Sequence, residues 1–339
     1  QTDEPLDGES YNGGPWDGFL VKYDESGTRQ WTRLFGSSMR DWIGDLTTDG
    51  QGNVYVAGQT DRSMYGEAHN GGKWDGFVVK FDGTGNRQWT RLIGGFKDDE
   101  VGALATDDQG NVYAAGWTES GLDGETYNGG NRDGYLIKLD GSGTRQWTRI
   151  DGSSAEDENE SVQTDGQGNV YVAGGTESVP RDEGLNGEAY AGADDGYVVK
   201  YDSSGARQWT RVVGTSSLDR ANSVATDGQG NVYVAGVTES GLNGETPNGE
   251  QDAFVVKYDG AGARQWTRLD GTSGWNAAES VTADGQGNVY VAGKTAEGLN
   301  GETFHGGPVD GYVVKYTTMG SRQWTRLQGT AGRDWASGV

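Results

Sequence analysis

Short stretches that mix apolar and polar residues follow one another along the whole chain, separated by turns rich in Gly and Asp. A clear example is the series 101–106 (VGALAT), 111–116 (NVYAAG), 133–140 (DGYLIKLD) and 144–150 (TRQWTRI). These stretches are rich in β-branched and aromatic residues, which favour strands, and DDQG and GSG between them are typical of tight turns. No segment keeps an apolar period of about 3.6 residues, so the sequence predicts essentially no helix.

This four-strand pattern occurs six times. The string RQWTR stands at 29–33, 87–91, 145–149, 207–211, 264–268 and 322–326. GNVYVAG starts at 52, 168, 230 and 287, with GNVYAAG at 110, and a third motif of the form D-[GA]-[FY]-[LV]-[VI]-K starts at Asp17, Asp75, Asp133, Asp195, Asp252 and Asp310. Three motifs that share one period of about 58 residues indicate tandem structural units.

A four-stranded antiparallel unit of this size cannot bury both of its faces alone. Stacking such units radially, as in a propeller, covers the faces and protects the sheet edges, whereas a linear solenoid would leave two open ends. We therefore predict an all-β, six-bladed β-propeller of four-stranded antiparallel blades, formed as a single domain by residues 1–339.

The two ends of the sequence align with internal parts of the repeat. Residues 1–14 match 117–130, and 333–339 match 40–46. We expect one blade to be shared between the two termini, and that blade lacks a strand in this sequence. Three explanations stay open: the sequence is an excerpt of a longer protein, a partner donates the strand, or the gap is tolerated.

The repeat also resembles a known family. SVATDGQGNVYVAG at 223–236, followed by DAFVVKYDGAGARQWTR at 252–268, resembles the SBBP family of β-propeller repeats, and is similar to NHL and PQQ-type blades. The resemblance implies that the SVATD-type strand is innermost in each blade and the RQWTR strand outermost. It also implies an extracellular or cell-surface location, but no single activity.

Composition restricts the partners. With a formal charge of −24 and a pI of about 4.3, the chain should repel nucleic acid and anionic membranes at long range. No apolar run is long enough for membrane insertion. The chain has no Cys and 2 His, which leaves neither disulfides nor thiolate metal sites.

The 12 tryptophans form two groups. Six recur in the RQWTR strand and are expected to form structural core: Trp31, Trp89, Trp147, Trp209, Trp266 and Trp324. The other six differ between repeats and fall in or beside the loops expected at one face: Trp16, Trp42, Trp74, Trp117, Trp275 and Trp335. We treat this second group as candidate ligand-binding residues, although pinning the loops to the sheet would also explain them.

One glutamate recurs in each long loop between the second and third strands: Glu9, Glu67, Glu125, Glu188, Glu245 and Glu302. These residues are weak calcium candidates, and a hydrogen bond to backbone amides would explain a fixed carboxylate equally well. The DGQGN and DGSGT strings are interpreted as hairpin turns rather than calcium loops. We commit to no metal and no cofactor, with calcium as the open alternative.

Catalysis has little support, because neither a Cys nucleophile nor a Ser–His–Asp set nor a phosphate-binding loop is visible. We therefore predict a non-enzymatic, secreted or cell-surface binding propeller. It would recognise a ligand, with carbohydrate as the leading class, or a protein partner through acidic, aromatic-bearing loops. The alternative is a structural subunit of an extracellular assembly, which would self-assemble through the incomplete blade.

Overall fold

A computed structural model describes residues 1–177 and 184–339. The chain divides into two compact units, Gln1–Asp151 and Gly152–Val339, called unit 1 and unit 2 below and described separately. The described residues contain strands, turns and loops and no helix. This confirms the predicted all-β class, whereas the single domain over 1–339 stays a prediction.

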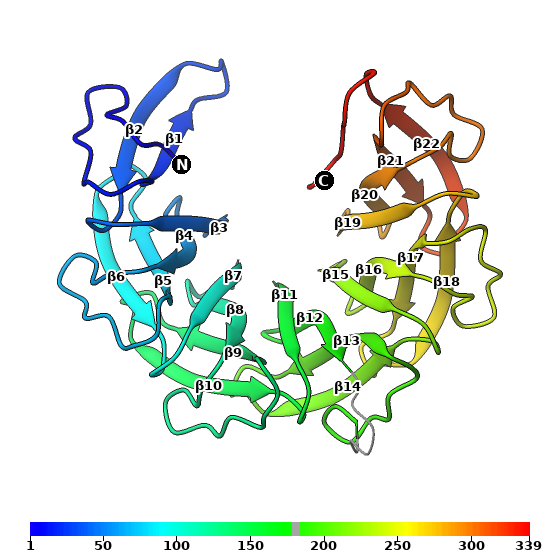
Figure 1. Ribbon diagram of the computed structural model, residues 1–339, viewed down its shortest axis with the longest axis horizontal. Helices are drawn as coiled ribbons and strands as arrows, with labels where there is room; N and C mark the ends of the chain where they lie inside the picture. Colours follow the sequence, from blue (N-terminus) through cyan, green and yellow to red (C-terminus); the bar gives the residue numbers. More distant parts are fainter. Residues whose placement is uncertain (178–183) are drawn as a thin grey trace. The chain divides into compact units, whose positions relative to one another are not determined.

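Unit 1 contains ten strands in three antiparallel sheets, ordered β1-β2, β3-β4-β5-β6 and β7-β8-β9-β10 (Figure 1). Their bounds are β1 Gly18–Tyr23, β2 Arg29–Phe35, β3 Asp41–Thr48, β4 Val54–Thr60, β5 Asp75–Phe81, β6 Arg87–Ile93, β7 Asp99–Thr106, β8 Val112–Thr118, β9 Asp133–Leu139 and β10 Arg145–Asp151.

Unit 2 contains twelve strands in three four-stranded sheets, ordered β11-β12-β13-β14, β15-β16-β17-β18 and β19-β20-β21-β22. Their bounds are β11 Asp157–Thr164, β12 Val170–Glu177, β13 Asp194–Tyr201, β14 Arg207–Val213, β15 Asp219–Thr226, β16 Val232–Thr238, β17 Asp252–Tyr258, β18 Arg264–Asp270, β19 Asn276–Ala283, β20 Val289–Thr295, β21 Asp310–Tyr316 and β22 Arg322–Gln328.

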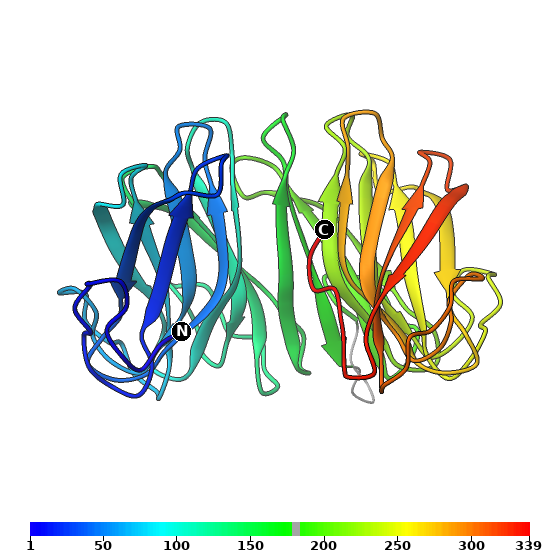
Figure 2. The ribbon, with the colours of Figure 1, turned by 90° about the horizontal axis from the view of Figure 1, so that it is seen from above.

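Each four-stranded sheet is one copy of the repeat, with sequential strands as hydrogen-bonded neighbours. Within each sheet the strands run between two ends, where turns and loops connect them (Figure 2). The first strand lies at one edge and the RQWTR strand at the other, as the family resemblance implies. The first repeat contributes only its third and fourth strands, β1 and β2, so its sheet has two strands.

In the β3–β6 sheet the core lies on the two middle strands, because neighbouring sheets of unit 1 cover both of their faces. Val54 and Val56 on β4 belong to a buried cluster with Phe35 of the preceding sheet. Tyr55 and Ala57, which point the other way, belong to a cluster shared with the following sheet. A strand buried on both faces needs apolar residues at every position, which is the physical reason for the VYVAG sequence.

Successive first strands are also tied together directly. Leu104 N donates to Asp45 Oδ2 at 2.8 Å in unit 1, and Val281 N donates to Ser223 Oγ at 3.1 Å in unit 2. In both cases the accepting side chain follows a shift in register of its own strand. The side chain that follows the register shift thus accepts a hydrogen bond from the backbone of the next first strand.

Candidate functional site

The repeated tryptophans join one sheet to the next. Trp89 is buried, and its indole Nε1 donates to the carbonyl oxygen of Gly141 at 3.1 Å, in the turn that precedes β10. Gly143 in the same turn has φ of +80°, and a Cβ there would stand 2.8 Å from the indole. The indole therefore packs against a backbone that only glycine brings so close.

The same arrangement recurs in both units. The indoles of Trp31, Trp209 and Trp266 donate to Gly83, Gly260 and Thr318 at 3.0–3.2 Å. The arginine two residues later also reaches the turn: Arg33 Nε donates to the carbonyl oxygen of Gly85 at 2.7 Å. The ring centroids of Trp147 and Tyr113 are 6.0 Å apart. Trp324, in the last repeat, is more exposed than the other repeated tryptophans.

The long loops fold back along the outermost strand of their own repeat. In the first loop a turn with Asp7 at φ of 56° brings Glu9 near β2. Glu9 Oε1 lies 3.1 Å from Arg33 Nη1, and Asp7 pairs with Arg29 and accepts a hydrogen bond from Thr32 Oγ1. Asp7 and Glu9 are therefore both paired with arginines of β2.

The six glutamates proposed above as weak calcium candidates share one structural partner. Each places Oε1 3.1–3.4 Å from the Nη1 of an arginine on the RQWTR strand. The pairs are Glu9–Arg33, Glu67–Arg91, Glu125–Arg149, Glu188–Arg211, Glu245–Arg268 and Glu302–Arg326. Arginine, rather than a backbone amide, is thus the partner that accounts for the repeated glutamate.

Two buried aspartates meet where successive sheets join. Asp75 at the start of β5 accepts a hydrogen bond from Asn70 N at 2.5 Å, and Asp99 at the start of β7 accepts one from Gly95 N at 2.8 Å. A Cβ on Gly94 would lie 2.7 Å from Asp75 Oδ1 and 3.0 Å from Asp99 Oδ2, so both carboxyl groups border this glycine. The aspartates therefore hold the loops at this end of the sheets.

Burial dominates the protonation of these groups. It raises the pKa of Asp99 to about 7, with Asp75 adding to the shift by charge repulsion and a hydrogen bond from Thr118 opposing it. Burial likewise raises the pKa of Asp41 to about 6, and Asp17 adds to that shift. In the sixth repeat Asn276 occupies the place of Asp99, fully buried, and its N donates the equivalent backbone hydrogen bond to the carbonyl oxygen of Gln251.

The four candidate binding tryptophans of unit 1 lie at strand ends beside these loops. Trp16 and Trp42 are exposed and meet edge to face, with ring centroids 5.0 Å apart. Lys73 Nζ lies 4.9 Å from the centroid of the Trp74 ring, and Arg132 Cζ lies 4.1 Å from the centroid of the Trp117 ring. The structure thus pairs Trp16 with Trp42, whereas Trp74 and Trp117 each pack with a cation.

The two candidate tryptophans of unit 2 share a cavity of about 530 Å³. Trp275 precedes β19 and is 37% exposed, and Trp335 in the C-terminal segment is 59% exposed. The cavity lies between the β19–β22 sheet and this segment, which Asp334 N and Ala336 N attach to the carbonyl oxygens of Val309 and Gly293.

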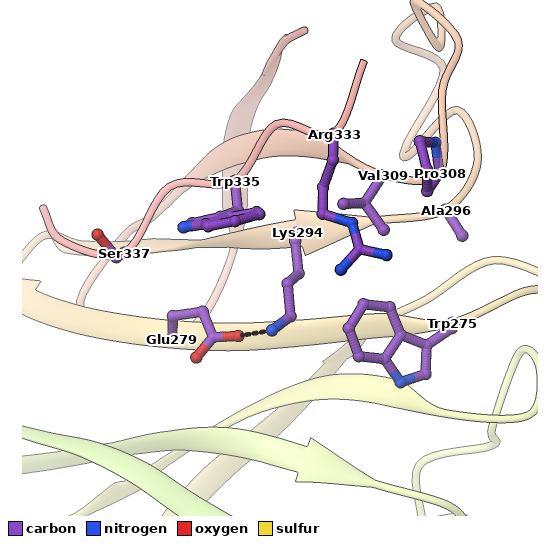
Figure 3. Close-up of a pocket in the computed structure, with 9 residues that line it drawn as sticks. All are labelled: Trp275, Glu279, Lys294, Ala296, Pro308, Val309, Arg333, Trp335 and Ser337. Carbon is purple, nitrogen blue, oxygen red and sulfur yellow. Dashed lines mark ion pairs between the residues drawn. The ribbon is translucent and has the colours of Figure 1, made fainter. Parts of the chain in front are cut away.

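Three charged side chains complete the lining (Figure 3). Lys294 on β20 places Nζ 2.5 Å from Glu279 Oε1 and 4.9 Å from the centroid of the Trp275 ring. Arg333 extends from the C-terminal segment toward Trp275. Sequence reasoning missed Lys294, Glu279 and Arg333. The recurrence of Arg-Asp-Trp at 40–42 and 333–335 was a visible signal for Arg333.

Each of the two histidines lies beside the aspartate that begins the next strand. His69 Nε2 lies 3.8 Å from Asp75 Oδ1, and His305 Nδ1 lies 3.1 Å from Asp310 Oδ2. Across residues 1–177 and 184–339, no three His, Cys, Asp or Glu side chains gather so that they could hold a metal ion. Nor does this part of the chain contain a helix long and apolar enough to cross a membrane.

Two known proteins are similar to the chain in sequence. The chain is 27% identical to the regulatory protein FlaEY of Caulobacter vibrioides over 98% of its own length. It is 26% identical to an uncharacterized WD repeat-containing protein of Acanthamoeba polyphaga mimivirus over 50% of its length. The chain spans 37% of the first relative and 16% of the second.

Among solved structures, the Pan2 WD40 domain of Neurospora crassa is similar over 92% of this chain and 82% of its own, with 12% identity and a TM-score of 0.48. The model of the SBBP family, described as a beta-propeller repeat, matches residues 30–63, 88–123 and 208–243. The match to the SBBP model confirms the resemblance seen in the motifs. At these three positions the chain therefore carries SBBP beta-propeller repeats.

Proposed function

We propose that this chain is a non-enzymatic binding module, in which propeller blades present aromatic side chains to a saccharide or a protein partner. The observation that carries the proposal is the cavity of unit 2, where Trp275 and Trp335 remain exposed beside polar groups. An exposed indole in a concave site can stack on the apolar face of a sugar ring, and the neighbouring polar groups can bind its hydroxyls.

The comparisons support the coarser part of this proposal. One relative is named a regulatory protein and the other contains WD repeats, and neither name refers to a reaction. The extracellular or cell-surface location belongs to the proposal as well, since it is implied by the resemblance to SBBP repeats.

The test is a glycan-array screen of the purified protein in calcium-containing buffer, followed by titration of the bound sugars. We expect a coherent set of ligands whose binding is lost in Trp335→Ala and Trp275→Ala. Met319→Ala, which removes a strongly exposed side chain outside the cavity, should bind as the wild type does. A clean negative on the array, or equal binding by all variants, would refute saccharide binding at this cavity and leave a protein partner as the ligand class.

One observation favours the alternative, a structural subunit. Strand β1 pairs only with β2, and Phe19 on β1 is 40% exposed, whereas its counterpart Phe77 on β5 is fully buried. An unpaired strand edge accepts strands from other chains. Light scattering over a concentration series separates the two functions, because a subunit should form ordered polymers and a binding module should stay monomeric.

A further inference from the structure

The cavity of unit 2 has a charge that sets it apart from the rest of the chain. Its ionic lining consists of Lys294, Arg333 and Glu279, which sum formally to +1, in a protein whose formal charge is −24. A locally positive cavity concentrates anions, while the overall field repels them.

We propose that this cavity binds a saccharide that carries one carboxylate, such as a terminal uronic acid, with Arg333 holding the carboxylate and Trp335 and Trp275 contacting the sugar ring. This inference rests on the proposed saccharide-binding function, and it names the class of sugar.

Of the two cations in the cavity, Arg333 is the one that is free to bind a ligand. Lys294 Nζ lies over the Trp275 ring and forms an ion pair with Glu279 Oε1, 2.5 Å away. By contrast, none of the described residues forms an ion pair or a hydrogen bond with the guanidinium of Arg333, which points into the cavity (Figure 3). A planar guanidinium binds a carboxylate through two parallel hydrogen bonds, and the formal charge of +1 of the cavity lining matches a ligand with one negative charge.

The nearby acidic groups do not compete for Arg333. Asp334 Oδ2 accepts hydrogen bonds from Thr330 N and Oγ1 at 2.7 and 2.9 Å. Glu297 Oε2 accepts one from Ser273 Oγ at 2.7 Å. Both carboxylates are therefore directed at their own loops, and the guanidinium is left for a ligand.

The corresponding residues of the first repeat provide a natural comparison. Arg40 and Trp42 align with Arg333 and Trp335, but there Arg40 Cζ lies 6.0 Å from the centroid of Trp16, and the Trp16 and Trp42 rings pack on each other. The aromatic faces that a sugar would need are thus partly occupied in unit 1. We expect the acidic sugar to bind at the unit 2 cavity.

The experiment compares two probes that differ at one group, methyl β-D-glucuronide and methyl β-D-glucoside. Both are titrated into the full chain, with tryptophan fluorescence and calorimetry as readouts. The wild type should bind the glucuronide roughly tenfold more tightly, because one charge-assisted pair is gained. Arg333→Gln should abolish this preference and still bind the glucoside, whereas Arg40→Gln should behave as the wild type.

The outcomes separate this inference from the function on which it rests. If both glycosides bind equally to the wild type and Trp335→Ala abolishes both, saccharide binding stands and the carboxylate assignment is wrong. If Arg333→Gln keeps the preference, the assignment is also wrong. If neither glycoside binds and the glycan array is negative, the proposed saccharide binding fails with it. Tighter binding of an acidic peptide than of the glucuronide would overturn the saccharide class.

Discussion

Replacing Asp99 by asparagine should stabilise the protein at neutral and alkaline pH. Asp99 is fully buried beside Asp75, and burial raises its pKa to about 7 from an ordinary value of 3.8. The folded state therefore takes up a proton that the unfolded state releases. The stability that this proton contributes is complete below pH 3.8, and it is lost as the pH rises through about 7.

The size of the effect follows from the shift. About three pKa units correspond to on the order of 4 kcal/mol of unfolding free energy, an upper limit because a buried site relaxes around its charge. Asparagine carries no charge, so Asp99→Asn should gain up to this amount at pH 8 and almost nothing at pH 4. The sixth repeat already has asparagine at this place: Asn276 is fully buried, and its Oδ1 accepts a hydrogen bond from Thr295 Oγ1 at 2.7 Å.

The assay is urea unfolding followed by tryptophan fluorescence at pH 4, 6 and 8 and constant ionic strength. Asp82→Asn is the matched control with the opposite sign. Hydrogen bonds from Thr84 and Asn86 lower the pKa of Asp82 to about 2, so its carboxylate stabilises the fold above the ordinary pKa of 3.8. This variant should lose stability at pH 8. An Asp99→Asn variant that is less stable at pH 8, or whose difference from the wild type does not change with pH, would refute the reasoning.

Three further predictions concern the repeat itself. Trp89→Ala should lower the unfolding free energy by roughly 3–5 kcal/mol, since it removes a buried indole. Trp335→Ala, which removes an exposed indole of the cavity, should weaken ligand binding and leave Tm nearly unchanged; denaturation and titration of both variants check this. Gly143→Ala should destabilise more than Gly124→Ala in thermal melts: both have positive φ, which costs about 1–2 kcal/mol, but only the Cβ at Gly143 meets an indole. Glu67→Gln should change stability by less than about 1 kcal/mol, because its ion pair with an arginine is half exposed. If Tm rises with calcium in the wild type and not in this variant, glutamate is a calcium ligand and the ion-pair interpretation is wrong.

Strands and turns could be predicted from the sequence because their causes are local. The stretch expected as a strand at 133–140 is β9, Asp133–Leu139, and the stretch at 144–150 corresponds to β10, Arg145–Asp151. Side-chain alternation and glycines with positive φ, such as Gly143 between these strands, act over a few residues. Because the motifs recur with a period of about 58 residues, the strands recognised in one repeat could be predicted at the matching positions of the others.

The candidate site could be predicted only in part. The tryptophans that differ between repeats were recognised from the sequence, but their grouping was not, since ring contacts depend on how sheets and loops pack. Trp16 meets Trp42 across 26 residues of sequence, and Trp275 shares a cavity with Trp335, 60 residues further on.

The charges show the same division. A recurring glutamate in an acidic loop is compatible with calcium in the sequence, and only the fold brings Arg33 within 3.1 Å of Glu9. The repeat, its strands and its turns were determined by the order of residues along the chain. The accessibility of Arg333, the pairing of the repeated glutamates with arginines and the raised pKa of Asp99 were decided by tertiary structure, because burial and long-range pairing depend on distances that no local pattern contains.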